Sequence, residues 1–202
     1  SAVRTVDAGV WEPLEAFVTF QMAEFGVPGV AVAIVQNGEI VFAKGYGVDA
    51  LAGCLDGFGI TRYLVGIDGE MRAKGHKPDG QAWAIAIEKP VVDVREVMGV
   101  MELADAAIAT SGTYRHWVEV AGTQHAHTMS PSARQPVCNR LASVTVVMPS
   151  CMLADAWATA LLVLGETAGV ELAQARGMDA LFVVRDGDDF QQISIVEGER
   201  QR

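Results

Sequence analysis

The chain has 202 residues, of which 50% are hydrophobic and 20% are charged, so it can bury the core of one large domain and lacks the composition of a disordered protein. Its 15 Lys and Arg residues against 25 Asp and Glu residues give a formal net charge of −10. This balance argues against a nucleic-acid-binding surface, because such binding depends on clustered cations. A phosphate ligand could still be held locally by a metal ion or by helix N-termini.

The cysteines and the apolar runs exclude two further classes of protein. Cys54, Cys138 and Cys151 are widely spaced, which predicts free thiols rather than a disulfide framework or a CxxC motif. The longest apolar run, 27–35, is much shorter than the roughly 20 residues of a membrane helix, so we expect no transmembrane segment. No signal peptide or lipidation site is visible, and the sequence does not indicate a compartment.

Hydrophobic spacing and turn signals predict the elements in chain order. The first are an amphipathic helix at 11–25, a hairpin with strands at 29–35 and 39–43, a helix at 48–58 and a buried strand at 63–67. Asn37-Gly38 is the preferred two-residue turn of such a hairpin. Further strands are expected at 83–87, 100–103, 107–109, 117–120 and 143–148, with a polar loop at 76–81.

The last part of the chain predicts two helices and a hairpin. Ser150 is the expected N-cap of a helix that ends at Gly165, and a second helix is expected at 167–176. Strands at 181–184 and 190–196 form the final hairpin. This mixed order of strands and helices predicts an α+β fold: a single domain of mixed, largely antiparallel sheet with packed helices.

Asp155 and Thr159 are the first candidates for chemistry. They lie four residues apart on the helix after Ser150, hence on one face, and offer a carboxylate and a hydroxyl to a hard cation such as Mg²⁺. The alternative is structural. Asp155 would then favour the positive end of the helix, and Thr159 would hydrogen-bond to the preceding turn.

Other segments give weaker signals, each with a structural alternative. Ser111 and Gly112 could let a phosphate or a flavin edge approach the backbone, or could form a turn between two strands. His125 and His127 would face the same side of a strand and could bind a metal or a phosphate, or could be ordinary surface or core residues.

The glycine pair Gly45 and Gly47 precedes a predicted helix. Backbone N–H groups there could meet a phosphate, although the spacing is neither that of a dinucleotide fold nor that of a P-loop, and a strand-to-helix turn explains it equally well. No nucleophile motif of the GxSxG or SxxK type occurs in the chain.

The order of these segments resembles a known family. The matching strings are AKGYGVDALAGCLDGFGITRYLVGIDGEMRAKG, GQAWAIAIEKP, IATSGTYRHW, the histidine-proline loop, LASVTVVMP and LADAWATALLVLG. In this order they resemble the FAD:protein FMN transferases, the ApbE-type flavin transferases, from about residue 43 onward. The resemblance implies an ApbE-like fold and an enzyme that splits FAD at its pyrophosphate with Mg²⁺. The FMN would be attached through a phosphoester to a Thr or Ser hydroxyl of a target protein.

The resemblance also implies roles for individual residues. It implies a metal held by Asp155, Thr159 and the backbone carbonyl of Ala43. It implies catalytic roles for His127 and Asp155. The implied flavin contacts are Lys44, Tyr46 and Asp49 in the turn, Ser111, Gly112 and Tyr114 in the TSG motif, and His127 and Met129 in the histidine loop.

Two segments depart from the family pattern. The usual histidine loop reads H-(I/V)-I-D-P-x-T-G-x-P, and here Ser130, Ala133 and Arg134 replace its acid, its Thr and its Gly. The usual Gly-Gly pair after the strand at 63–67 is Asp68-Gly69. Both changes lie beside expected ligand surfaces, so we expect them to affect activity more than fold.

The N-terminal part resembles a different family. Residues 11–47 are similar to the opening helix and hairpin of serine β-lactamase-like hydrolases, but the SxxK motif that should follow is missing. We therefore divide the chain into an N-terminal helix and hairpin, 1–42, and an ApbE-like region, 43–202. A truncated or replaced N-terminus would weaken FAD binding.

The sequence leaves three possible functions for this chain. Protein flavinylation is the first. A non-catalytic FAD-binding or nucleotide-binding domain is the alternative, favoured by the altered histidine loop. A β-lactamase-like hydrolase is the third, favoured only by the residues before about 47.

Overall fold

The computed structural model describes residues 12–25, 30–36, 39–67, 69–91, 96–114, 117–120, 123–187 and 189–201. The helices are α1 (Glu12–Phe25), α2 (Val48–Gly57) and α3 (Cys151–Ala175). The strands are β1 (Val30–Gln36), β2 (Glu39–Tyr46), β3 (Tyr63–Ile67), β4 (Glu70–Lys74), β5 (Trp83–Glu88), β6 (Val97–Leu103), β7 (Ala107–Gly112), β8 (Trp117–Val120), β9 (Thr123–Ala126), β10 (Met129–Ser130), β11 (Gln135–Pro136), β12 (Leu141–Met148), β13 (Asp179–Asp186), β14 (Asp189–Val196) and β15 (Glu199–Arg200).

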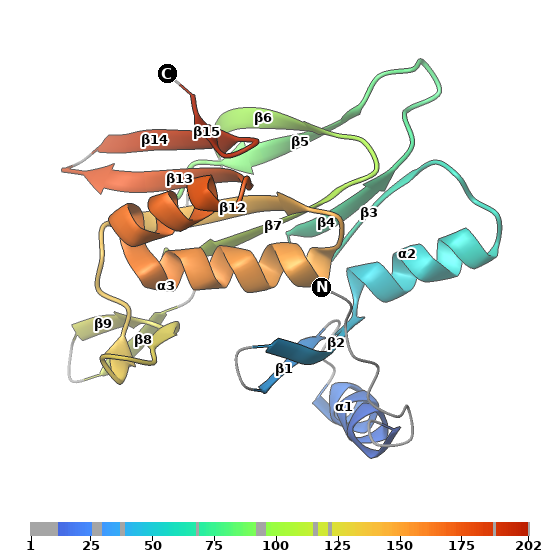
Figure 1. Ribbon diagram of the computed structural model, residues 1–202, viewed down its shortest axis with the longest axis horizontal. Coiled ribbons are helices and arrows are strands. Elements are labelled where there is room, and N and C mark those ends of the chain that lie inside the picture. Colours follow the sequence, from blue (N-terminus) through green and yellow to red (C-terminus); the bar gives the residue numbers. More distant parts are fainter. Residues whose placement is uncertain are drawn as a thin grey trace.

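Seven strands form one antiparallel sheet in the order β15-β14-β13-β12-β7-β4-β3. Helix α3 crosses one face of this sheet, and the β5–β6 hairpin packs on the other (Figure 1). The alternation of β13 explains the two cores, because Phe182 and Val184 pack with α3 whereas Leu181 and Val183 pack with the β5–β6 side. The α+β prediction with a largely antiparallel sheet is confirmed.

A break in α3 lies at Gly165, whose backbone is not helical (φ 84°, ψ 179°). This region of φ and ψ is essentially restricted to glycine. The side-chain amide of Asn139 donates to the Leu162 carbonyl at 2.7 Å and so satisfies an acceptor beside the break. The two predicted helices are therefore present, joined by a kink. The kink is tight: a Cβ atom on Gly169 would approach the Leu161 carbonyl oxygen to 2.8 Å.

The apolar character of α3 follows from its place on the sheet. By length and composition it could cross a membrane, although the apolar runs of the sequence predicted no transmembrane segment. Its buried residues, among them Ala158, Leu161 and Leu162, pack against the strands, as expected for a core helix. Its N-terminus begins as predicted, with the Ser150 hydroxyl accepting from the Leu153 amide at 3.3 Å.

Several strands differ from their predicted bounds. β2 continues to Tyr46 and β7 continues to Gly112, so both extend into segments predicted as turns. β4 was not predicted, because its sequence EMRAK is too polar to resemble a strand. Pairing with β3 along its length and with β7 at Met71 and Arg72 forms it nevertheless. The three cysteines are free thiols, as predicted.

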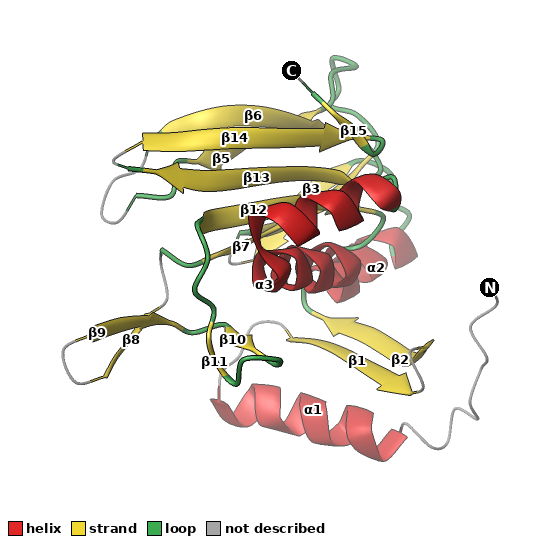
Figure 2. Cartoon of the chain, turned by 60° about the vertical axis from the view of Figure 1, so that its left-hand side comes forward, coloured by secondary structure: helices red, strands yellow, loops and turns green. Residues whose placement is uncertain are grey.

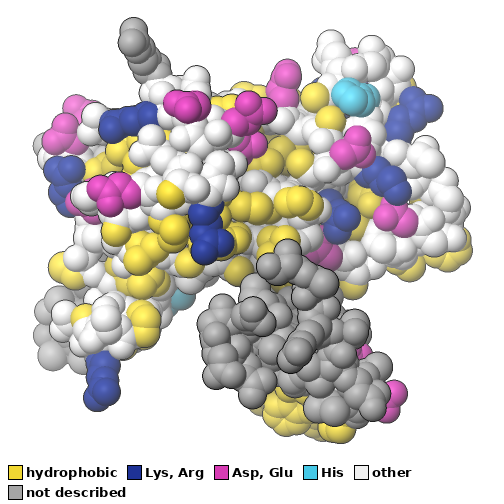
Figure 3. Space-filling model, viewed as in Figure 1, with side chains coloured by type: hydrophobic (Ala, Val, Ile, Leu, Met, Phe, Trp, Pro, Cys, Tyr) yellow, Lys and Arg dark blue, Asp and Glu magenta, His cyan; other side chains and the backbone are white. Residues whose placement is uncertain are grey.

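The N-terminal elements stand apart from the large sheet. The predicted hairpin is present as β1–β2, with its Asn37-Gly38 turn outside the described residues. Figure 2 shows α1 below this hairpin. The helix predicted at 11–25 is present as α1, but none of its residues is buried, and Phe17, Phe20 and Phe25 are 60%, 62% and 73% exposed. Figure 3 shows hydrophobic side chains on the surface of this lowest part.

Candidate functional site

Two hydroxyls meet where α3 packs on β7, one helical turn from the Asp155 carboxylate. Asp155 and Thr159 lie one turn apart on α3, and the hydroxyls of Thr159 and Ser111 are 2.8 Å apart. The Asp155 side chain is half-buried, and this burial raises the pKa of its carboxyl. Among the described residues its carboxylate has no hydrogen-bond or ion-pair partner. A partly desolvated, unpaired carboxylate beside two hydroxyls is an arrangement that a cation would stabilise.

The structural alternatives for this pair do not hold. Asp155 is the fifth residue of α3, outside the first turn, where the described helix carries no acidic residue. Thr159 shares its hydrogen bond with Ser111 of β7 rather than with the preceding turn of its own helix. Within the described ranges, no three His, Cys, Asp or Glu side chains come together. A cation here would therefore take its other protein ligands from hydroxyls and backbone carbonyls, which suit Mg²⁺.

The predicted turn residues lie in a strand instead. Ala43, Lys44 and Tyr46 belong to β2, where they pair with Ala33, Val32 and Val30 of β1. The turn prediction for 43–47 is thus wrong, because β2 runs on until only Gly47 separates it from α2. β2 contacts both α2 and α3, so its backbone lies beside the helix that carries Asp155.

Asp49, in the first turn of α2, binds groups of α3 and β4 through its carboxylate. Its carboxylate accepts from the backbone amides of Cys151 and Met152 at 3.1 and 2.9 Å, and from Arg72 Nη1 at 2.6 Å. Cys151 also links α3 to β4, because its thiol donates to the Met71 carbonyl at 3.2 Å. Burial and the nearby Asp49 charge raise the pKa of Cys151 to about 12, so it stays a thiol.

The TSG motif is part of β7 rather than a turn. Ser111 and Gly112 pair with Val144 and Ser143 of β12, which rules out the turn alternative. The Tyr114 ring covers Gly112 so closely that a Cβ atom there would lie 2.8 Å from it, and this burial raises the pKa of the Tyr114 hydroxyl.

Thr113 holds this segment in place. Its amide donates to the Ala142 carbonyl at 3.0 Å, and its hydroxyl accepts from Arg185 Nη2 at 2.8 Å. Arg185 also donates to the Leu141 carbonyl at 2.8 Å. The sequence carries no signal for Arg185, Arg72 or the role of Cys151, because each acts on a segment far away in the chain and no local pattern marks it.

The histidine loop is a separate small hairpin. His125 belongs to β9 and the exposed His127 follows its end, so the two do not share one strand as considered from the sequence. Met129, 53% exposed, lies in β10, which pairs with β11. In Figure 2 this hairpin lies below the large sheet, on the same side as β1–β2.

The three family departures in this loop leave a well-formed turn. The Ser130 hydroxyl accepts from the Ala133 amide at 3.3 Å, a bond that an Asp could also make. Arg134 stands where the family pattern has Gly, and its backbone is left-handed (φ 53°). A residue with a Cβ atom is strained in this region, so the loss of the glycine has a physical cost that the loop tolerates.

We expect Arg134→Gly to stabilise the protein by about 0.5–1 kcal/mol, because glycine adopts a left-handed backbone without strain. This gain is the net effect, since glycine also loses more conformational entropy on folding. Urea unfolding would measure the difference. Ser132→Gly in the same loop is the control, since its backbone is not left-handed and the same change should give no gain. Equal stability of Arg134→Gly and the parent would contradict the strain.

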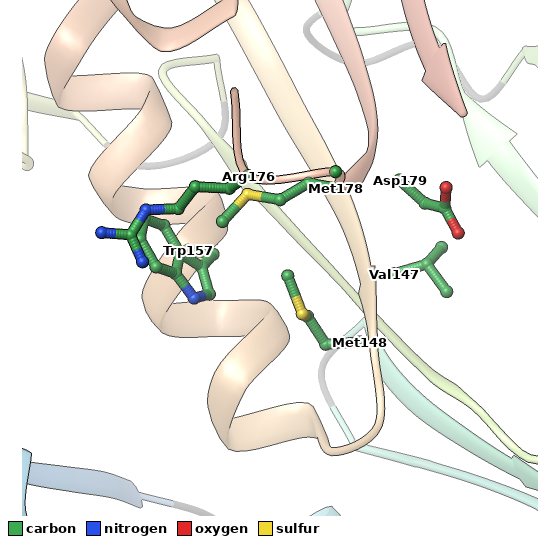
Figure 4. Close-up of a pocket in the computed structure, with 7 residues that line it drawn as sticks. Val147, Met148, Trp157, Arg176, Met178 and Asp179 are labelled. Carbon is green, nitrogen blue, oxygen red and sulfur yellow. The ribbon is translucent and has the colours of Figure 1, made fainter. Parts of the chain in front are cut away.

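A cavity of about 360 Å³ lies elsewhere, between α3 and the adjoining ends of β12 and β13. Figure 4 shows Trp157, Met148 and Met178 around it, with Arg176 over the Trp157 ring at 5.0 Å from its centroid. None of the residues predicted for the site lines this cavity. Its carboxylate, Asp179, already accepts from the Glu197 amide at 2.6 Å.

Comparison with known proteins identifies the family. The model of the ApbE family matches residues 40–182, a range that includes β2 except its first residue, the TSG motif, the histidine loop and all of α3. The chain belongs to the ApbE family. The ApbE match thus contains Ala43, Asp49, Ser111, Asp155 and Thr159 in one continuous range.

Individual ApbE relatives agree with this assignment. An FAD:protein FMN transferase of Vibrio cholerae is 47% identical over 150 residues, which are 74% of this chain and 45% of the relative. One of Escherichia coli K12 is 35% identical over 170 residues, 84% of this chain and 47% of the relative. The solved flavin transferase ApbE from Vibrio cholerae superposes with a TM-score of 0.63 at 44% identity, covering 73% of this chain and 47% of that one. The chain therefore spans about half the length of the curated relatives it matches.

Proposed function

We propose that this chain acts in the Mg²⁺-dependent transfer of FMN from FAD to a Thr or Ser hydroxyl of a target protein. The observation that carries the proposal is the half-buried Asp155 carboxylate, which lacks a partner among the described residues and lies one turn from the Thr159–Ser111 hydroxyl pair. ApbE family membership and relatives named FAD:protein FMN transferases support it.

The reaction exchanges the phosphoanhydride bond of FAD for a phosphoester bond to the target protein. The acceptor oxygen forms a bond to the phosphorus that carries riboflavin, the pyrophosphate bond to AMP breaks, and the hydroxyl proton passes to a base. We assign Asp155, Thr159 and the Ala43 carbonyl to a Mg²⁺ ion, which when bound would neutralise pyrophosphate charge. His127 is our candidate for the base, because an imidazole can accept a proton at neutral pH.

The flavin would contact β2, the end of β7 and the histidine loop. We assign to it Lys44 and Tyr46 of β2, Ser111, Gly112 and Tyr114 at the end of β7, and His127 and Met129 of the histidine loop. The ring of Tyr114 over Gly112 and the bonds of Thr113 to Arg185 and Ala142 give this surface a fixed shape. A fixed surface favours binding because less entropy is lost when the ligand binds.

We keep the division of the chain into 1–42 and 43–202 as part of the proposal. It is supported by the family match, which begins at residue 40, and by α1, which buries none of its residues. The likeness of residues 11–47 to β-lactamase-like hydrolases would make this segment a recombined one. A serine hydrolase activity is disfavoured, because the SxxK motif is missing.

Mass spectrometry tests the proposed transfer. The chain is incubated with FAD, Mg²⁺ and a protein that carries a flavinylation motif, and the acceptor is expected to gain the mass of one esterified FMN. EDTA should prevent the gain. Quenching of flavin fluorescence without any gain in mass would instead support a non-catalytic FAD-binding domain, the alternative that the altered histidine loop favours.

A further inference from the structure

The Asp49 carboxylate joins three elements of the fold. Its Oδ1 atom accepts from the Cys151 amide at 3.1 Å and from Arg72 Nη1 at 2.6 Å, and its Oδ2 atom accepts from the Met152 amide at 2.9 Å. Asp49 lies in the first turn of α2, and Arg72 in β4. The Asp49 side chain is only 15% exposed, so solvent weakens these charged bonds little. One carboxylate thus ties the starts of α2 and α3 to β4.

These bonds also occupy the N-terminus of α3. The amides of Cys151 and Met152 donate to Asp49, and that of Leu153 donates to Ser150. A helix N-terminus with free N–H groups attracts phosphate, but here a protein carboxylate already neutralises it. The charge of a pyrophosphate is therefore left to a cation beside Asp155.

The same carboxylate determines how the two sides of the proposed metal site face each other. Only Gly47 separates β2 from α2, and the two elements are in contact, so the position of the first turn of α2 limits where the end of β2 can lie. Asp155 and Thr159 lie in the first nine residues of α3, before its break at Gly165. Because Asp49 holds the first turn of α2 against the first residues of α3, it holds β2 against Asp155.

We propose that Asp49 is the positioning residue of this site: it holds Asp155 and Thr159 in register with the end of β2 and thereby sets the affinity for a divalent cation. The proposal rests on the function proposed above and revises the expectation that Asp49 contacts the flavin. Both of its carboxylate oxygens are engaged by the protein.

Mn²⁺ binding to the full chain, followed by electron paramagnetic resonance, tests the proposal. We expect Asp49→Asn to weaken Mn²⁺ binding by about 10-fold, the lower end of the effect of residues that orient metal ligands. Hydrogen exchange should be faster in the 151–155 segment of this variant. Asp56→Asn is the matched control, because Asp56 also pairs α2 with β4, through Lys74 at 2.7 Å, but its other side-chain partner in the described part of the chain is Tyr63 of β3 rather than a residue of α3. Its Mn²⁺ affinity should stay within about 2-fold of the parent.

The outcomes separate this proposal from the function on which it rests. Parent-like Mn²⁺ affinity in Asp49→Asn, with only a lower melting temperature, would reduce Asp49 to a structural residue and overturn the proposal alone. Loss of FAD binding in EDTA with unchanged Mn²⁺ binding would also overturn it, in favour of direct flavin contact. A parent chain that binds no Mn²⁺ would overturn the metal site itself and this proposal with it.

Discussion

Asp155→Asn is expected to abolish metal-dependent stabilisation and to reduce FMN transfer by about 10²–10³-fold, the usual effect of losing a group that stabilises charge in the reaction. The same variant should be at least as stable as the parent when no metal is present. Burial raises the pKa of Asp155, so its charged form is unfavourable in the folded protein at neutral pH, and the neutral amide does not carry this cost.

The raised pKa of Asp155 determines how the stability of the parent changes with pH. A carboxyl with a raised pKa contributes stability below its ordinary pKa, and this contribution is lost as the pH rises through the raised value. In EDTA, the melting temperature of the parent should therefore fall relative to Asp155→Asn as the pH rises above about 4, the ordinary pKa of an aspartate. At the higher pH, Mg²⁺ should raise the melting temperature of the parent but not of the variant.

Glu171→Gln is the control for this experiment. Glu171 is an exposed carboxylate on the second half of the same helix, so its neutralisation should leave both the Mg²⁺ response and the transfer rate unchanged. An Asp155→Asn variant that still melts at a higher temperature in Mg²⁺ would remove Asp155 from the metal site.

Phe182→Ala is expected to cost about 3–5 kcal/mol of unfolding free energy, the largest effect on stability that we foresee. The Phe182 side chain is fully buried (0% exposed) in the cluster that joins α3 to the sheet. Its ring also lies against Gly169, where a Cβ atom would be 3.3 Å from it. A closely packed core relaxes only partly around a missing ring, so a cavity is left.

Urea unfolding, with the melting temperature as a second measure, would check this value. A loss of about 2–4 °C is expected for each kcal/mol in a domain of this size. Phe58→Ala removes the same ring from a position that is 79% exposed, and it should change the free energy of unfolding by less than about 0.5 kcal/mol. A loss below about 1 kcal/mol for Phe182→Ala would mean that the core relaxes around the missing ring.

The site was predictable where its residues share a helix. Asp155 and Thr159 are one turn apart in any α-helix, so spacing alone placed them on one face. The contact of Thr159 with Ser111 could not be predicted from spacing, because it depends on which strand α3 crosses. For Asp49 the resemblance predicted a flavin contact, whereas the fold surrounds its carboxylate with two amides and a guanidinium from distant segments.

The sequence alone determined the elements that local chemistry specifies. Helical spacing, the Ser150 cap, the stop at Gly165 and the hairpin signals each act over a few residues, so the helices, the β1–β2 and β13–β14 hairpins and the α+β class followed from them. The tertiary structure decided what depends on neighbours. Strand β4 exists because β3 and β7 supply its partners, and β7 extends through the TSG motif because β12 pairs with it. Free polar groups acquire a role only from what the fold places beside them, and this is why Asp155 lacks a described partner while Asp49 has three.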